Sequence, residues 1–213
     1  MKNKSVLIIG AGGHAKVLVD SLRTKNISIL GMLDVNPDLI GKEVLGIRVL
    51  GSEDNILKNY SPADVDLVNG MGSTGIPDQR KKIFLKFKEL GYCFLNITHL
   101  TAYVGDDVIF GQGAQLMAGS IIQPGGRMGE NVILNTRAAI DHDCYIGDHV
   151  HLAPGVICCG GVTIGHETHI GSGAVILQGI TIGDNCIIAA GAVVTRNVHA
   201  ATKVAGVPAK IME

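Results

Sequence analysis

Hydrophobic residues recur at every sixth position through the second half of the chain. Counting in sixes from Leu116 through Ile122 and Met128 to Val194 gives fourteen consecutive matches, and a mostly small residue lies two positions before each match. A period of six fits neither a helix nor a long alternating strand, but it is typical of short strands joined by tight turns. With three hexads to a coil, the pattern predicts about five stacked coils over residues 108–197, with the sixth positions, Cys158 among them, filling the axis.

The first third of the chain has a different pattern. Apolar runs predict strands over 5–9, 27–33, 65–69 and 93–96, and helical spacing predicts helices over 15–23 and 78–90. Between the first strand and helix, Gly10, Gly12 and Ala15 fit the G-x-G-x-x-A fingerprint of dinucleotide-binding folds, and Asp34 ends the next strand. Only one mononucleotide half fits before the coil, so we expect a half-Rossmann-like domain over 1–97 that holds a single nucleotide, followed by a coil domain over 98–213.

Composition and charge exclude several classes of protein. The 213 residues carry a net charge of -1, which leaves no basic surface for nucleic acid or an anionic membrane. The five cysteines form no C-x-x-C pair, which favours reduced thiols. The lysines at the N-terminus precede an apolar run of only residues 6–9, too short for a signal peptide or a membrane helix, so we expect a cytoplasmic protein.

The coil resembles the hexapeptide-repeat acyltransferases, and this resemblance implies a left-handed parallel β-helix. The segment 205–210, AGVPAK, resembles the recurring end of that family's coil. Over its whole length the chain is similar to bacterial acetyltransferases that act on nucleotide-linked amino sugars, which are grouped with the sialic acid O-acetyltransferases.

That resemblance implies roles for the N-terminal residues. Gly12, Gly13 and His14 would lie at the phosphates and the sugar, Asp34 at the nucleoside, and Gly72 near the base or ribose. A histidine at a helix start can also act simply as a cap. Two features depart from the family pattern and leave the base open between uridine and guanosine: Val35 stands where some relatives have a second acid, and 73–77 is interpreted as an insertion.

In the coil, the polar stretch 135–152 holds the candidate catalytic residues. His142 lies two residues after the inward Ile140, and His151 lies one residue before the inward Leu152. Both side chains are therefore expected to point outward, half a coil apart. They would meet only between subunits, and the resemblance implies a homotrimer with active sites between neighbouring coils. A neutral imidazole can accept a proton near pH 7, so His142 is the candidate general base, with Asp143 fixing its tautomer.

The acetyl donor is expected to be held mainly by backbone groups. Attack on a thioester builds charge on the carbonyl oxygen, and the Gly160–Gly161 pair could stabilise that charge. The resemblance implies Gly160 as the oxyanion donor, Asn135 as a polar residue of the cleft, and contacts to acetyl-coenzyme A from His151, Ser172 and Ala190. Acetyl-coenzyme A would be a co-substrate, with no resident cofactor and no metal.

Several alternatives remain open at the level of sequence. The leading interpretation is N-acetylation of a nucleotide-linked 4-amino-4,6-dideoxy sugar for glycan biosynthesis, and O-acetylation of a sialic acid is the nearest alternative. A zinc-dependent hydratase of the γ-carbonic anhydrase type would use His142, His149 and His151 between subunits. A non-catalytic sugar-binding module is the third class. Cys159 is expected to face outward without a nucleophilic role, and His149, His166 and His169 are expected to be exposed turn residues.

Overall fold

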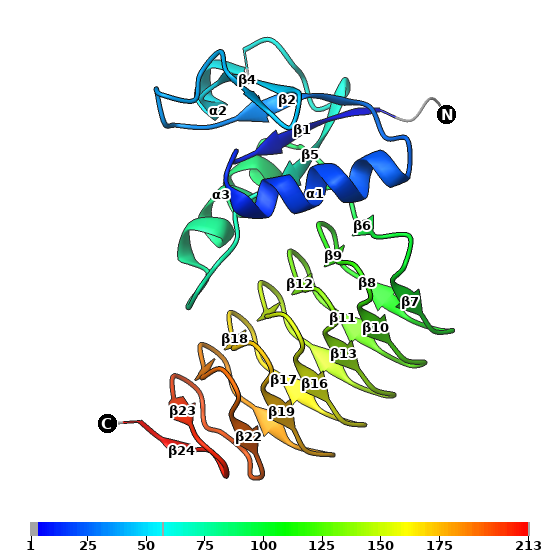
Figure 1. Ribbon diagram of the computed structural model, residues 1–213, viewed down its shortest axis with the longest axis vertical. Helices are drawn as coiled ribbons and strands as arrows, with labels where there is room; N and C mark the ends of the chain where they lie inside the picture. The colour runs from blue at the N-terminus through cyan, green and yellow to red at the C-terminus, as the bar shows by residue number, and fades with distance from the viewer. Residues whose placement is uncertain (1–3, 57, 213) are drawn as a thin grey trace. The chain divides into compact units, whose positions relative to one another are not determined.

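The computed structural model describes residues 4–56 and 58–212, which form two compact units (Figure 1). The first unit holds the described residues up to Gly72 together with Gln79–Leu100. The second unit holds Ser73–Asp78 together with the coil from Thr101 onward. The short segment Ser73–Asp78 therefore groups with a coil that begins more than twenty positions later in the sequence.

A five-stranded sheet forms the centre of the first unit. Its order is β3-β4-β2-β1-β5, with β1 (Ser5–Ile9), β2 (Ile29–Leu33), β4 (Ile47–Gly51) and β5 (Val65–Asn69) parallel, and β3 (Glu43–Val44) antiparallel to β4. The helices are α1 (Gly13–Thr24), α2 (Glu53–Ile56) and α3 (Asp78–Glu89), and β6 (Ile97–Thr98) ends the unit. The chain runs from β1 outward to β2 and β4 and then returns to the other side of β1 as β5. This reversal creates a topological switch point between β1 and β5, where open parallel sheets bind ligands.

The sequence pattern missed one hairpin and overestimated one strand. β3 and β4 are joined by Leu45–Gly46, with φ of 51° and 72°. Asn-Gly is the usual signal for such a turn, and a leucine at positive φ hides it. The strand expected over 93–96 is reduced to a single bridge between Leu67 and Phe94.

The second unit is a coil of two-residue strands that recur every six residues. Most strands pair in parallel with the strand eighteen residues later, as Ile121 does with Ala139, so three hexads close one coil. The coil starts at Tyr103, earlier than the expected residue 108. Figure 1 shows the layers following one another from β7 towards the C-terminus.

Three parallel sheets make up the faces of the coil. The first holds β7 (Tyr103–Val104), β10 (Ile121–Ile122), β13 (Ala139–Ile140), β16 (Ile157–Cys158), β19 (Val175–Ile176) and β22 (Val193–Val194). The second holds β8 (Ile109–Phe110), β11 (Arg127–Met128), β14 (Tyr145–Ile146), β17 (Thr163–Ile164) and β20 (Thr181–Ile182). The third includes β9 (Gln115–Leu116), β12 (Ile133–Leu134), β15 (His151–Leu152), β18 (His169–Ile170), β21 (Ile187–Ile188), β23 (Lys203–Ala205) and the antiparallel β24 (Lys210–Ile211).

The residues expected at the axis are buried. The fourteen sixth-position side chains, from Leu116 to Val194, are all at most 3% exposed, and they form one cluster with most of the residues two positions before them. Cys158 lies in this cluster as expected, and burial raises the pKa of its thiol far above the usual range. Burial also raises the pKa of Cys144 to about 11, which keeps that thiol protonated and unreactive.

Glycines that follow the sixth position allow successive coils to approach closely. A Cβ built on Gly165 would lie 2.5 Å from the Asp184 nitrogen, and one on Gly183 would lie 2.5 Å from the Ala200 nitrogen. Any side chain there would collide with backbone, so these positions require glycine.

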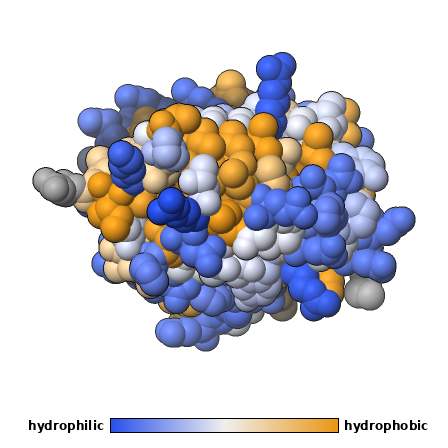
Figure 2. Space-filling view, turned by 90° about the horizontal axis from the view of Figure 1, so that it is seen from below, coloured by the Kyte–Doolittle hydropathy of each residue, from blue (hydrophilic) through white to orange (hydrophobic). Residues whose placement is uncertain are grey.

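Seen from below the view of Figure 1, the surface has a continuous hydrophobic area bounded by hydrophilic residues (Figure 2). Val207, Ile211 and Met212 are among the exposed hydrophobic side chains of the C-terminal segment.

None of the helices in the described part of the chain combines the length and the apolar character needed to cross a bilayer.

Candidate active site

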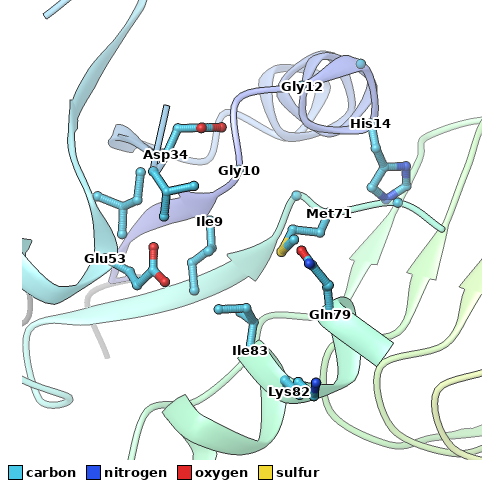
Figure 3. Close-up of a pocket in the computed structure, with 15 residues that line it drawn as sticks. Ile9, Gly10, Gly12, His14, Asp34, Glu53, Met71, Gln79, Lys82 and Ile83 are labelled. Atoms are coloured by element: carbon cyan, nitrogen blue, oxygen red, sulfur yellow. The ribbon is translucent and has the colours of Figure 1, made fainter. Parts of the chain in front are cut away.

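A pocket of about 500 Å³ lies at the switch point of the sheet, at the carboxyl ends of β1 and β5 (Figure 3). All five residues expected to hold the nucleotide line it: Gly12, Gly13, His14, Asp34 and Gly72. They come from the turn after β1, the start of α1, the end of β2 and the turn after β5. The parallel sheet is what brings these separate stretches of sequence together.

The glycine turn leaves an open site for an anion. Gly10 takes a φ of 98° and donates its N–H to the Leu33 carbonyl, which ties the turn to β2. Gly12 caps α1 without a side-chain hydrogen bond, and the first turn of the helix has no acidic residue. A Cβ built on Gly12 or Gly13 would have no atom of the described chain within 4 Å beyond its immediate neighbours. A phosphate can therefore approach the N–H groups at this helix start closely.

Asp34 is fixed by two backbone groups. The Ala11 N–H donates to Oδ2 at 2.8 Å, and the Asn36 N–H donates to Oδ1 at 2.9 Å. A carboxylate accepts about four hydrogen bonds, so lone pairs remain for the hydroxyl groups of a ribose. Asp34 thus shapes the glycine turn and remains able to bind a nucleoside.

Three polar residues of the pocket were missed by the sequence argument. Glu53 lies on the same side of the pocket as Asp34, and Gln79 lies on the side of His14, with Lys82 one turn further along α3 (Figure 3). Gln79 and Lys82 are three residues apart on a helix that was expected, so their shared face could have been predicted. Glu53 belongs to α2, for which the sequence pattern gave no signal.

A buried arginine holds the turn after β5. Arg80 is 1% exposed, and its Nη1 donates to the carbonyls of Asn69 at 3.0 Å and Met71 at 2.6 Å. The Asn69 amide in turn donates to the Arg80 carbonyl. Burial lowers the pKa of Arg80 to about 9, and its Nε and Nη2 have no partner within the described residues. This clamp fixes Met71 and Gly72 at the edge of the pocket.

His142, Asp143 and Gly160 meet at one corner of the coil. The His142 Nδ1 lies 2.8 Å from Asp143 Oδ2, and a carboxylate accepts hydrogen bonds, so Nδ1 carries the proton. The other ring nitrogen, Nε2, is left with a lone pair. Asp143 is placed for this contact by a turn in which its φ is 59°.

The electrostatics of this corner favour a basic imidazole. The hydrogen bond to Asp143 raises the pKa of His142 above its usual value; desolvation opposes the rise, and the charges of Asp141 and Asp143 add to it. The His142 side chain is 55% exposed, so a substrate can reach it.

Gly160 lies directly beneath the His142 ring, one coil later. A Cβ on Gly160 would be 2.5 Å from Nε2, so the ring can take this position only over a glycine. Across residues 4–56 and 58–212, no acceptor is hydrogen-bonded to the Gly160 N–H. A basic nitrogen and an unused backbone donor therefore lie side by side, as a general base and an oxyanion donor require.

Asn135, His151 and Ser73 form a second cluster. The Asn135 amide lies 3.1 Å from His151 Nε2, and His151 Nδ1 lies 2.9 Å from the Ser73 hydroxyl and 3.0 Å from its carbonyl oxygen. A pocket of about 390 Å³ adjoins this cluster and is lined also by Ser172 and Ala190. The residues expected at the acetyl donor thus share one pocket, and His142 is not among its lining residues.

Two histidines differ from the sequence expectation. His149 and His169 were expected to be exposed turn residues, but they are 7% and 8% exposed. His149 contacts the Asn131 amide in the preceding coil at 3.0 Å, and His169 packs edge-on against His151 with ring centroids 5.0 Å apart. Burial lowers the pKa of His169, so its ring is neutral. His166 is partly exposed and lies beside Asp148.

Two of the three histidines named for the hydratase alternative are buried and already have hydrogen-bond partners within the chain. His149 and His151 are buried and already hydrogen-bonded to asparagine amides. Nowhere in the described chain do three His, Cys, Asp or Glu side chains gather in a way that could hold a metal ion.

Two family models and a known relative match this chain. Residues 5–87 match the PglD N-terminal domain, and residues 161–196 match the bacterial transferase hexapeptide (six repeats). The chain is 32% identical over 165 residues to GDP-perosamine N-acetyltransferase of Escherichia coli O157:H7, covering 74% of this chain and 71% of that protein.

Solved structures match almost the whole chain. The acetyltransferase domain of PglB from Neisseria gonorrhoeae FA1090 has a TM-score of 0.89 and 33% identity, covering 99% of this chain and 100% of that one. PerB from Caulobacter crescentus, solved in complex with CoA and GDP-perosamine, has a TM-score of 0.89 and 35% identity, with 98% and 97% covered. The coil is thus a left-handed β-helix of hexapeptide repeats, and the protein is an acetyltransferase that belongs to the family of bacterial nucleotide-sugar N-acetyltransferases.

Proposed function

We propose that this protein transfers the acetyl group of acetyl-coenzyme A to the amino group of a GDP-linked 4-amino-4,6-dideoxy sugar. The observation that carries the proposal is the pairing of His142 with Asp143 above the Gly160 backbone. The guanosine assignment rests on two relatives, one named for GDP-perosamine and one solved with it. Such a product would serve glycan biosynthesis.

The nucleotide would occupy the pocket of the first unit. Its diphosphate would lie at Gly12, Gly13 and His14, its ribose at Asp34, and its base near Gly72. The glycine-capped helix start and the open space at both glycines support the phosphate position. We retain the division of the chain into a nucleotide-sugar domain over 1–97 and an acyltransferase domain over 98–213 as part of this proposal.

In the proposed reaction the neutral amine attacks the thioester carbonyl directly. His142 Nε2 removes a proton from the amine as the carbon–nitrogen bond forms, and Asp143 stabilises the resulting imidazolium. The Gly160 N–H stabilises the carbonyl oxygen as it becomes negative. Collapse of the intermediate breaks the carbon–sulfur bond, and the proton held by His142 passes to the leaving thiolate. His151, Ser172 and Ala190 would hold the acetyl donor, with Asn135 fixing His151.

We also propose a homotrimer with active sites between subunits, in the cytoplasm. The outward residues of the first sheet form a stripe with aligned register, and the stripe consists of Tyr103, Ile121, Ala139, Ile157, Val175 and Val193. Tyr103, Ile121 and Ile157 are 53%, 37% and 46% exposed. Burial of such a stripe against a neighbouring subunit would remove this apolar surface from water.

A direct assay tests the proposal. The protein is incubated with acetyl-coenzyme A and, separately, with a GDP-linked 4-amino sugar, its UDP-linked counterpart, and a sialic acid. We expect thiol release and an N-acetylated product, identified by mass spectrometry, with the GDP-linked sugar. Product from the UDP-linked sugar alone would overturn the base assignment, and an O-acetylated sialic acid would overturn the acceptor.

A variant of the glycine turn tests the nucleotide site by itself. Gly13→Leu fills open space without a backbone clash, so GDP affinity should fall at least tenfold in isothermal titration calorimetry, a change of about 1.4 kcal/mol. Lys16→Leu, on the same helix but outside the pocket, is the matched control and should bind GDP as the parent does. If Gly13→Leu binds GDP as tightly as the parent does, the nucleotide does not bind in this pocket.

A further inference from the structure

The segment Ser73–Asp78, which contains the expected insertion 73–77, forms one wall of the pocket of about 390 Å³ beside His151, called here the donor pocket. Ser73 and Thr74 line that pocket together with His151, His169 and Ser172. Pro77 is buried, and a Cβ built on Gly75 would touch Ile187 at 4.0 Å, so the segment is packed onto the coil unit to which it belongs. Neither the nucleotide site nor the catalytic corner accounts for this segment.

The hydrogen bonds around His151 determine its protonation. The Thr136 N–H lies 2.8 Å from one atom of the Asn135 amide, and a backbone N–H can only donate, so that atom is the amide oxygen. The amide nitrogen therefore faces His151 Nε2 at 3.1 Å and donates to it. Nε2 must then hold a lone pair.

The other side of the ring leads to the same tautomer. The Ser73 carbonyl oxygen lies 3.0 Å from Nδ1 and can only accept, so Nδ1 carries the proton. The neighbouring His169 ring is buried, which lowers its pKa and keeps it neutral, so this ring places no charge beside His151. His151 is thus a neutral ring with both nitrogens engaged.

This tautomer determines what the Ser73 hydroxyl can do. Its oxygen lies 2.9 Å from the same Nδ1–H, so it accepts a hydrogen bond from His151 and cannot donate there. Within the described chain its own proton has no acceptor, and the side chain borders the donor pocket. Because the Ser73 oxygen accepts the hydrogen bond from His151, its own O–H remains available to donate to a ligand in the pocket.

We propose that Ser73 is a binding residue for the acetyl donor, and that its hydroxyl donates to a carbonyl oxygen of the pantetheine-thioester arm of acetyl-coenzyme A. Asn135 and His151 act as positioning residues, because they orient that hydroxyl through a fixed chain of hydrogen bonds. The inference rests on the proposed use of acetyl-coenzyme A in this pocket. It explains how His151 can contribute to donor binding while both of its ring nitrogens bond to Asn135 and Ser73.

Nitrogen NMR of the imidazoles tests the first step in the ligand-free full-length protein. We expect His151 to show a protonated Nδ1 and an unprotonated Nε2, both in the parent and in Ser73→Ala, because the Ser73 carbonyl remains in the variant. A proton on Nε2 of the parent would overturn the proposal.

Binding of acetyl-coenzyme A, measured by calorimetry without acceptor, tests the second step. Ser73→Ala should weaken the Kd by roughly three- to tenfold, as expected for one lost neutral hydrogen bond, and Ser73→Thr should restore it to within about twofold. Affinity for GDP should not change in either variant. Thr163→Ala removes a hydroxyl from another face of the coil and should bind acetyl-coenzyme A as the parent does.

The outcomes separate this inference from the proposed function. If the parent binds acetyl-coenzyme A and Ser73→Ala binds it equally well, Ser73 is not a donor-binding residue, and the proposed reaction stands. If Ser73→Ala changes the GDP affinity instead, the hydroxyl serves the nucleotide sugar and the inference is wrong. If the parent does not bind acetyl-coenzyme A at all, the proposed function and the inference fail together.

Discussion

At the scale of single residues, the catalytic proposal depends on two hydrogen-bonding groups on one imidazole. Asp143 fixes the proton on Nδ1 of His142, and the glycine beneath the ring leaves Nε2 accessible. The His142 side chain is more than half exposed, so it contributes little packing to the coil. Its role can therefore be separated from stability.

We expect His142→Ala to lower kcat by about 10²- to 10⁴-fold, the range that a general base contributes. Thermal unfolding followed by circular dichroism should show an unchanged midpoint, because the side chain is exposed. Steady-state kinetics with acetyl-coenzyme A and the GDP-linked amino sugar measure the effect. Retention of the parental kcat would rule out His142 as the base.

The pH profile provides a second prediction at this scale. The base must be neutral, so kcat/KM should fall as the pH drops below the pKa of His142, which Asp143 raises. In Asp143→Asn the acidic limb should move to lower pH, and the plateau of kcat should fall by about ten- to a hundredfold because the imidazole becomes less basic. Asparagine also tolerates the positive φ at this position, so the turn should persist. If the acidic limb of Asp143→Asn stays at the parental pH, Asp143 does not influence the group that titrates.

At the scale of elements, the turns of the coil place the active residues. Asp143, Gly161 and Gly179 occupy equivalent turn positions in successive coils, each at positive φ. Gly160 does not need a positive φ, and it is required to be small only by the His142 ring above it.

Gly160→Ala should therefore displace the His142 ring and lower kcat by at least tenfold, while the coil remains folded. The control is Gly179→Asn, in which the new Cβ has no atom of the described residues within 4 Å beyond its immediate neighbours, and asparagine tolerates the positive φ. Steady-state kinetics and thermal unfolding compare the two variants. Equal activity in both would mean that the ring position over Gly160 has no importance for the reaction.

The sequence predicted elements well where burial repeats and poorly where it does not. Every sixth residue from Leu116 to Val194 is buried, so the period reveals the coil directly. The β3–β4 hairpin was missed because Leu45 is an unusual turn residue, and the burial of His149 was missed because its partner Asn131 lies a full coil earlier. Likewise, nothing in the local pattern links Ser73 to His151, which is 78 residues away.

At the scale of the whole molecule, the proposal places the active site between subunits. The first sheet presents an apolar stripe to solvent in a single chain, and the catalytic corner follows β13 of that sheet. A trimer would bury the stripe and place neighbouring donor pockets near each corner.

The variant Ile121→Glu/Ile157→Glu should prevent assembly, since two charges would enter an apolar interface. Light scattering after size-exclusion chromatography should show monomers, with acetyl transfer reduced at least a hundredfold and GDP binding retained. Lys88→Glu, a charge change on α3 of the other unit, serves as the control and should leave the trimer intact. A fully active monomer would contradict an active site shared between subunits.

The eighteen-residue pairing register restricts how such a chain can change in length. Adding or deleting six or twelve residues within the coil would carry every later residue round to another face, and a change that is not a multiple of six would also put glycines beneath bulky neighbours. Only a complete layer can be gained or lost without moving the histidines to the wrong side. Insertions of other lengths are confined to the corners of the coil, where a loop can leave the stack of layers and return to the same corner.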